Sequence, residues 1–421
     1  MEQADQLLVV RLNNYRAVEA AYGKAAATGA MSHLLRAIER HLGRIALRRS
    51  AGDEIILTAR HARMRCLPAG TLVDTLCAVA GAEPFRLGDS DILLSVSAGD
   101  APLAASPRGA EEAARSRLAA SNLPSVQIMG GSEQWAALYA RDMRAAVLLL
   151  KRVRHGGTFL NWRPVSRPGN QGTTLYHEAL LRRAGDRGEQ TDCAEGYAAL
   201  ERLGLAHMLD RLLLSDVVDE LESDPAACLS VSMSAQSLSL DLHGQGAGWT
   251  DLLARLRRDR SLARRLVVEI ADNSVMPRFR DMLTFVRALR ALGVRISVAG
   301  FGSGHASIEQ LMVLAPDVVK LDSSFLQSAR QSERDRVRIG HLIGLARTVS
   351  PAVIVDGVES PWHLALAMEE GADWVAGSHL GRPSLRRGGL NAGYSGSVAS
   401  LAAFNSALHP QAARGSGTFS R

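Results

Sequence analysis

The sequence predicts an α/β protein in which a mixed α+β domain precedes a barrel of the TIM type. A chain of 421 residues is long for one domain, so two domains are expected. From Thr158 onward, short apolar strands alternate with helical segments in about eight strand-then-helix units, the pattern of such a barrel. The part before it carries a hairpin and helices, and this indicates a separate α+β fold.

Local patterns predict the elements of the first domain. The stretch "QLLVVRL" (6–12) is typical of a buried strand, and two apolar runs around Gly52 and Asp53 predict a hairpin over 45–59. Further elements expected here are helical segments within 15–43, a strand over 91–98, an alanine-rich helix over 109–120 and a helix over 133–153. We place a first domain at 1–125, a linker and connecting helix at 126–155, a barrel at 156–390 and a Gly/Ser/Ala-rich basic tail at 391–421.

The barrel strands follow from eight short apolar runs. They are expected at 158–165, 174–182, 228–234, 265–272, 294–300, 317–322, 352–358 and 374–380. In barrels of this type the chemistry lies at the C-terminal ends of the strands. These ends carry Glu178, Ser232, Glu269, Asp272, Ala299, Gly300, Lys320, Asp322, Asp356 and Glu359. Acids on separate strands favour a ligand-binding mouth. The alternative is that they cap the following helices, a role to which Asp272 is equally suited.

Composition sets broad limits on function. The net charge of +6 permits anionic partners without identifying one, and no nucleic acid is predicted. Four scattered cysteines without a metal-binding spacing are expected to be reduced thiols of a cytoplasmic protein. No leader peptide and no apolar run long enough for a membrane span is seen, so no membrane partner is expected.

The second domain resembles the EAL family, bacterial barrels that bind and usually hydrolyse the second messenger cyclic di-GMP. The resemblance is carried by "YHEALLR", "SVSMSAQSL", "VVEIADN", "VAGFGSGHASIEQL", "VVKLDSSFL", "VDGVES" and "GRP", which occur in the family's order and spacing. The resemblance as a whole covers nearly all of 142–385. The resemblance implies an EAL-type (β/α)8 barrel with a nucleotide site at its mouth.

The first domain resembles the GGDEF family of diguanylate cyclases, through "RSAGDEIIL" and "RLNNYRAVEAAYG". The family's metal-binding aspartate falls on Arg11 and its helix asparagine on Glu19, while Asp53 and Glu54 remain. A cation cannot ligate Mg²⁺. The upstream product-inhibition motif is also absent, since Gly43 and Ala46 occupy its ends. This domain is therefore expected not to make cyclic di-GMP.

The barrel site also departs from the family's catalytic pattern. Active members hold two divalent ions with carboxylates and one asparagine, and the matching positions here keep Glu178, Glu269, Asp322 and Glu359. The asparagine has become Ser232, and two loop aspartates have become Ala299 and Gly300. Without bridging carboxylates, two metals cannot activate water. We expect no catalysis, no required cofactor and no binding of Mg²⁺ or Mn²⁺.

The resemblance also implies a set of nucleotide-binding positions. Arg182 matches the family arginine that contacts a phosphate, and a guanidinium suits that task. The family's glutamine falls on Arg163, an arginine that could either attract an anionic ligand or fill the pocket against it. The full set of expected contacts is Arg163, Glu178, Leu180, Arg182, Phe301, Gly302, Ser303, Lys320, Asp356 and Pro383.

Three functions are compatible with this pattern. The leading hypothesis is a non-catalytic cyclic di-GMP receptor that relays binding to an unidentified signalling protein, with a homodimer formed through the barrel. A nucleotide-independent protein scaffold is the alternative favoured by Arg163, and a weak metal-dependent phosphodiesterase is the alternative favoured by the four remaining acids. Lys320, one of three lysines in the chain, is either a compact cation needed by the site or a counter-ion for its acids.

Overall fold

The computed structural model describes residues 6–42, 45–59, 73, 83–103, 106–120, 133–185, 189–239, 249–271 and 279–387. The chain divides into two compact units. The first comprises Met1–Lys151, Ala194–Leu209 and Leu240–Leu252, and the second comprises Arg152–Cys193, Asp210–Ser239 and Leu253–Arg421. The predicted tail at 391–421 and the first part of the predicted linker, 126–132, lie outside the described residues.

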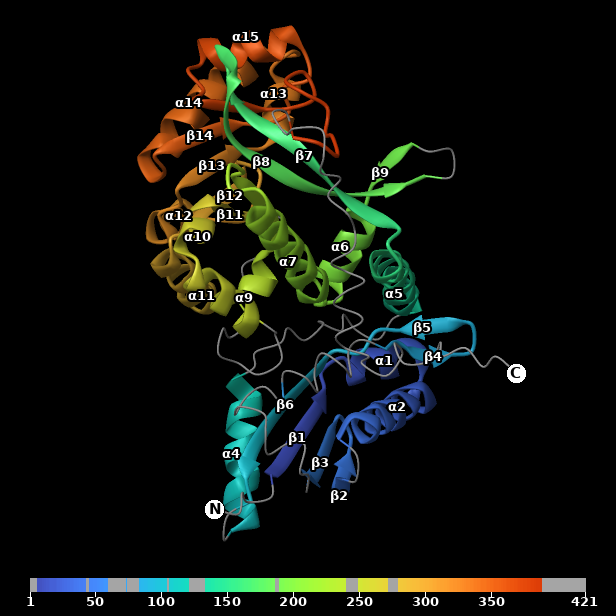
Figure 1. The fold of residues 1–421 in the computed structure, drawn as a ribbon. Helices are drawn as coiled ribbons and strands as arrows, with labels where there is room; N and C mark the ends of the chain where they lie inside the picture. The colour runs from blue at the N-terminus through green and yellow to red at the C-terminus, as the bar shows by residue number, and fades with distance from the viewer. Residues whose placement is uncertain are drawn as a thin grey trace, which may run out of the picture. The chain divides into compact units, whose positions relative to one another are not determined.

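The first unit is built on an antiparallel sheet in the order β2-β3-β1-β6 (Figure 1). Its strands are β1 (Gln6–Leu12), β2 (Ile45–Ala51), β3 (Glu54–Ala59) and β6 (Val96–Pro102), and a separate short hairpin joins β4 (Phe85–Leu87) and β5 (Ser90–Ile92). The predicted strand 6–12 and the hairpin 45–59 are confirmed, with Gly52 in a left-handed conformation at the turn.

The predicted strand at 91–98 is replaced by two strands with a gap between them. The side chain of Asn14 explains the gap, because its amide nitrogen donates to the Leu93 carbonyl at 2.8 Å and its oxygen accepts from Ser95 N–H at 3.1 Å. These backbone groups are therefore bonded to a side chain instead of a neighbouring strand. Nothing in the local apolar pattern indicates this distant partner.

Helix α4 (Pro107–Ala120) packs against the sheet of the first unit. The other helices in this part of the structure are α1 (Tyr15–Tyr22), α2 (Lys24–Leu42), α5 (Glu133–Arg154) and α6 (Ala194–Arg202). Leu7 and Val9 of β1 pack against Ala110, Ala114 and Leu118 of α4. The alternate residues Leu8 and Val10 are also fully buried, so apolar side chains lie on both faces of β1.

The second unit is a closed barrel, which confirms the predicted fold class (Figure 1). Its sheet runs β10-β11-β12-β13-β14-β15-β7-β8-β9 and closes because β8 also pairs with β10. The strands are β7 (Thr158–Arg167), β8 (Asn170–Ala184), β9 (Gln190–Asp192), β10 (Leu229–Ser234), β11 (Leu266–Ala271), β12 (Arg295–Phe301), β13 (Val318–Leu321), β14 (Ala352–Val355) and β15 (Trp374–Ala376).

One strand of the barrel runs against the others. Strand β7 is antiparallel to both of its neighbours, β15 and β8, whereas the pairs from β8 through β10 to β15 are parallel. Strands β7 and β8 are joined directly by a short turn, so no helix separates the first two predicted strands. This reversal differs from a strict strand-then-helix repeat and determines which side chains of β7 reach the mouth.

Helices follow the parallel strands. They are α7 (His207–Ser223), α8 (Ala235–Leu238), α9 (Trp249–Arg258), α10 (Arg260–Arg265), α11 (Phe279–Leu292), α12 (Ile308–Leu314), α13 (Ser323–Ser328), α14 (Glu333–Val349) and α15 (Pro361–Glu369). Within the described part of the chain, no helix combines the length and the apolar character needed to cross a membrane.

Candidate ligand-binding site at the barrel mouth

The interior of the barrel consists of an apolar layer with a charged layer next to it. Val165, Tyr176, Val267, Val318 and Ile354 form one buried cluster on five different strands. Side chains two residues apart on a strand point to the same face. On the parallel strands the next inward residues toward the C-terminal end are Glu178, Glu269, Lys320 and Asp356.

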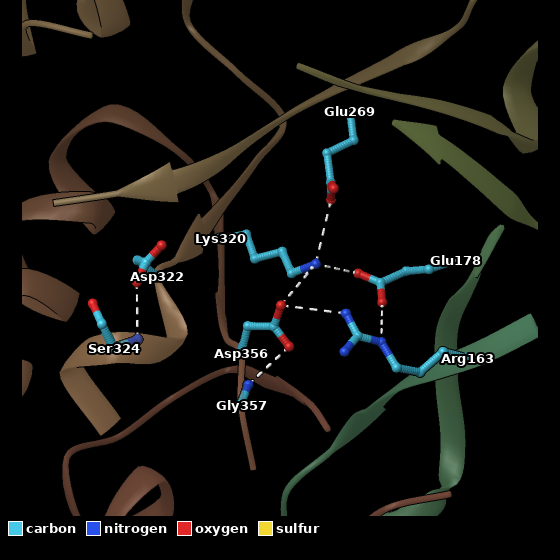
Figure 2. A network of polar contacts seen from close by, with 8 residues as sticks. All are labelled: Arg163, Glu178, Glu269, Lys320, Asp322, Ser324, Asp356 and Gly357. Carbon is cyan, nitrogen blue, oxygen red and sulfur yellow. Dashed lines mark hydrogen bonds and ion pairs between the residues drawn. The ribbon is translucent and has the colours of Figure 1, made fainter. Parts of the chain in front are cut away.

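Strand β7 contributes to this charged layer in the opposite direction. Strand β7 is antiparallel to its neighbours, so its chain direction at the mouth is reversed. On the parallel strands the charged residue follows the apolar layer by two positions, whereas on β7 it precedes Val165 by two positions. That residue is Arg163, which lies opposite Glu178 in the register of β7 and β8. Five charged side chains therefore meet at the mouth, four of them from strands and the fifth, Asp356, from the position directly after β14 (Figure 2).

Lys320 lies at the centre of this cluster. Its Nζ donates to Glu178 Oε1 at 2.6 Å and lies 3.1 Å from Asp356 Oδ2 and 3.7 Å from Glu269 Oε2 (Figure 2). Burial alone would lower the pKa of Lys320, but the three carboxylates raise it above its ordinary value. The amine therefore stays charged. Its contacts are those of a counter-ion for the three acids.

Arg163 bridges two of the same carboxylates. Its Nε donates to Glu178 Oε2 at 2.5 Å and its Nη2 donates to Asp356 Oδ2 at 3.2 Å (Figure 2). Burial would lower the pKa of Arg163, but Glu178 and Asp356 raise it. The sequence left open whether Arg163 attracts an anionic ligand or fills the pocket. Its contacts with Glu178 and Asp356 correspond to filling the pocket.

The acids of the cluster differ in their electrostatic environment. Burial would raise the pKa of Asp356, but Lys320 and Arg163 lower it to about 2. Asp356 Oδ1 also accepts from the Gly357 N–H at 2.8 Å. Burial raises the pKa of Glu269, and the neighbouring acids raise it further against the opposing effect of Lys320. Glu269 Oε2 has no hydrogen-bond partner among the described residues.

The other expected metal-binding positions lie away from these contacts. Asp322 is the N-cap of α13, where its Oδ1 accepts from Ser324 N–H at 2.8 Å, and Glu359 is exposed. Ser232 is also exposed, two residues before the end of β10. Ala299 and Gly300 lie just before the last residue of β12 and carry no ligand atoms in their side chains. Asp322 thus has the helix-capping role that was the alternative to ligand binding (Figure 2). Asp272, the other acid considered for capping, lies outside the described residues.

The remaining expected nucleotide contacts lie on two strands and the adjoining loops. Glu178, Leu180 and Arg182 share one face of β8, because the pairing with β7 continues without interruption from one to the next. Arg182 is half-buried, and no ion pair or hydrogen bond of its guanidinium is found among the described residues.

The loop after β12 and the segment after β15 provide the other contacts. Phe301 is buried, whereas Gly302 and Ser303 are exposed. Gly302 has φ +94°, and a Cβ there would lie 2.7 Å from the Phe325 ring, so this position requires glycine. The Pro383 carbonyl accepts from the Asn161 side chain at 3.2 Å.

In the first unit, a cation occupies the position expected for a metal ligand. Arg11 donates to Glu54 Oε1 at 2.6 Å, and Arg115 donates to Glu54 Oε2 at 2.9 Å. Asp53 is 3.9 Å from the Arg11 guanidinium. Sequence reasoning identified Arg11 and Glu54 but missed Arg115, which lies on α4 and has no local signal connecting it to the hairpin.

The fold and the mouth together define a class of protein: a TIM-like barrel with one reversed strand and a polar site at the C-terminal ends of its parallel strands. A family model described as "EAL domain" matches residues 146–383, which is more than half of the chain. The chain therefore belongs to the EAL domain family.

Individual relatives extend this comparison. An uncharacterized protein, y4lL, of Sinorhizobium fredii is 24% identical over 90% of this chain and 45% of its own length. The cyclic di-GMP phosphodiesterase PdeF of Escherichia coli is 22% identical over 58% of this chain and 32% of its own length. The chain thus covers less than half of each of these two relatives.

A solved structure covers both units. It is the fragment "S helix-GGDEF-EAL" of Vibrio cholerae LapD bound to c-di-GMP, with 16% identity, a TM-score of 0.50 and 90% of each chain covered. A likeness at this identity shows the fold. The predicted order of a GGDEF-like domain followed by an EAL-type barrel is confirmed at that level.

Proposed function

We propose that this chain is a non-catalytic cyclic di-GMP receptor in bacterial signalling. The dinucleotide binds at the mouth of the barrel, and binding is relayed to a protein partner. The relay requires that the ligand distinguish two arrangements of the protein, because a ligand shifts only equilibria between states that it binds differently.

The main support for the proposal is that the acids at the mouth already have partners within the protein. Lys320 and Arg163 are bonded to Glu178 and Asp356, so these two carboxylates already have cationic partners. Asp322 caps a helix, and the positions of three further family ligands hold Ser232, Ala299 and Gly300. A two-metal hydrolytic mechanism needs carboxylates that bridge the ions, and this arrangement argues against it.

Support for nucleotide binding comes from the edge of the mouth and from the comparisons. Arg182 lies on the same face of β8 as Glu178, and its cross-strand neighbour on β9 is Asp192. A guanidinium in this position suits a phosphate oxygen. The LapD fragment with a similar fold is described as bound to c-di-GMP.

Two other functions are favoured by particular observations. The Arg163 bridge fills part of the mouth and favours a scaffold that binds proteins without nucleotide. The similarity to PdeF, a cyclic di-GMP phosphodiesterase, favours a weak metal-dependent enzyme. A receptor is compatible with the Arg163 bridge and with the similarity to PdeF when the nucleotide binds at the rim of the mouth, through Arg182 and without metal.

Calorimetric titration with cyclic di-GMP tests the proposal. We expect binding in the micromolar range or tighter for the unmodified chain, and a loss of at least about tenfold, or about 1.4 kcal/mol, for Arg182→Ala. Arg183→Ala is the matched control, because Arg183 is the next residue of β8 and points to the opposite face. Equal losses for both variants would contradict the assigned contact, and the absence of binding by the unmodified chain would leave the scaffold.

A further inference from the structure

The guanidinium of Arg163 donates hydrogen bonds to the carboxylates of both Glu178 and Asp356. Of the oxygens of Glu178, Oε1 accepts from Lys320 and Oε2 accepts from Arg163. Asp356 Oδ2 lies within ion-pair distance of both cations, and its Oδ1 accepts from Gly357 N–H. All four carboxylate oxygens therefore already have an N–H donor or a cation beside them (Figure 2).

We propose that Arg163 is a built-in counter-ion that keeps divalent cations out of the barrel mouth. Its side chain supplies, from the reversed strand β7, the positive charge that a metal ion would supply between Glu178 and Asp356. A tethered cation of this kind holds the two carboxylates together at any metal concentration.

The donor set itself fits a divalent ion poorly while Arg163 is present. Mg²⁺ and Mn²⁺ prefer several oxygen ligands in near-octahedral geometry. Among the residues that the structure describes, no group of three or more His, Cys, Asp or Glu side chains is arranged to hold a metal. An ion placed between Glu178 and Asp356 would also lie beside two fixed positive charges, which repel it.

Removing the guanidinium should reverse this preference. Without Arg163, three buried acids, Glu178, Glu269 and Asp356, remain around the single charge of Lys320. The net negative charge then favours a cation, and two carboxylate oxygens that now face Arg163 become free to ligate it. Arg163 would thus be the residue that decides whether this mouth accepts metal.

The test is calorimetric titration of the full chain with MnCl₂. We expect the unmodified chain to bind Mn²⁺ at least tenfold more weakly than Arg163→Gln, with one site per chain in that variant. Arg163→Lys retains a cation and should behave like the unmodified chain. Arg167→Gln is the matched control, because Arg167 lies on the same strand but against the Trp374 ring, and it should not gain a site.

Arg163→Met serves as a second neutral variant if Arg163→Gln does not fold, which thermal unfolding with and without MnCl₂ would reveal. The proposal is overturned if neither neutral variant binds Mn²⁺ more tightly, or if the unmodified chain binds it equally well. Because the titrant is the metal alone, this result does not depend on whether cyclic di-GMP binds.

Discussion

Lys320 is the residue on which the charged cluster of the barrel depends most. Three carboxylates lie within 3.7 Å of its amine, and the side chain is nearly inaccessible to solvent. Buried acids are tolerated only with a compensating charge, because transfer of an ion out of water costs several kcal/mol. The stability of the mouth is therefore expected to depend on this one ammonium group.

Replacing Lys320 with methionine should lower the free energy of unfolding by about 3–5 kcal/mol, since it leaves buried acids short of a partner. Denaturant unfolding of the barrel measures the loss. Arg336→Met is the control, because Arg336 forms an exposed ion pair with Glu369 in the same unit, and such pairs contribute no more than about 1 kcal/mol. Similar small losses in both variants would contradict the central role of Lys320.

At this scale the sequence predicted that acids meet at the mouth, but it did not separate Glu178, Glu269 and Asp356, which do, from Asp322 and Glu359, which do not, and it did not show how they are neutralised. Glu178, Glu269, Lys320 and Asp356 each follow an apolar strand core, so their convergence could be expected from the barrel alone. The contact of Arg163 depends on the reversal of β7, and a single strand's pattern contains no information on its direction. The two roles considered for Arg163 could not be separated without that register.

Among the elements, long periodic segments were predictable and short ones were not. The strands β7 to β15 match the expected runs except for β9. The long helices α5, α11 and α14 lie within a few residues of the ranges that their sequence patterns predict, 133–153, 277–292 and 332–349. The short helices α8 and α13 were missed, and α12 was expected only as a helix of unspecified length after the glycine loop. Their hydrophobic pattern spans only one or two turns, and caps such as Ser307 and Asp322 set where α12 and α13 begin.

The loop after β14 depends on one glycine. Gly357 has φ +83°, and a Cβ there would lie 2.6 Å from Ser323 Cβ. Gly357→Ala should therefore lower the unfolding free energy by at least about 1–3 kcal/mol, the usual range for a strained backbone.

Gly344→Ala is the matched control for this substitution. Gly344 lies within α14, where an added Cβ meets nothing within 4 Å, so this variant should gain up to about 1 kcal/mol in unfolding free energy. Thermal or denaturant unfolding of both variants checks the difference. Equal effects would mean that the loop relaxes around the new methyl group.

For the whole molecule, we propose that the exposed apolar side chains of the barrel form the interface of the homodimer expected from the sequence. Met312 and Val313 on α12 are 64% and 51% exposed, and Val337 and Leu345 on α14 are also exposed. Helices α12 and α14 contact each other, so these residues belong to one region of the surface. The homodimer proposed through the barrel is therefore expected to bury α12.

Sedimentation velocity tests this assignment. The unmodified chain should sediment as a dimer at micromolar concentrations, and Met312→Glu should shift it to a monomer because a carboxylate would be buried in the interface. Met368→Glu is the control, since Met368 is 49% exposed on α15. A monomeric unmodified chain, or equal behaviour of both variants, would contradict the proposed interface.

The most direct test of the account compares titration of the unmodified chain with cyclic di-GMP in EDTA and in MgCl₂, with the linear product assayed afterwards. A mouth neutralised by Lys320 and Arg163 needs no metal. We therefore predict the same affinity in both buffers and no hydrolysis. Binding that appears only with Mg²⁺, or product formed in its presence, would contradict the central claim of a metal-independent, non-catalytic receptor.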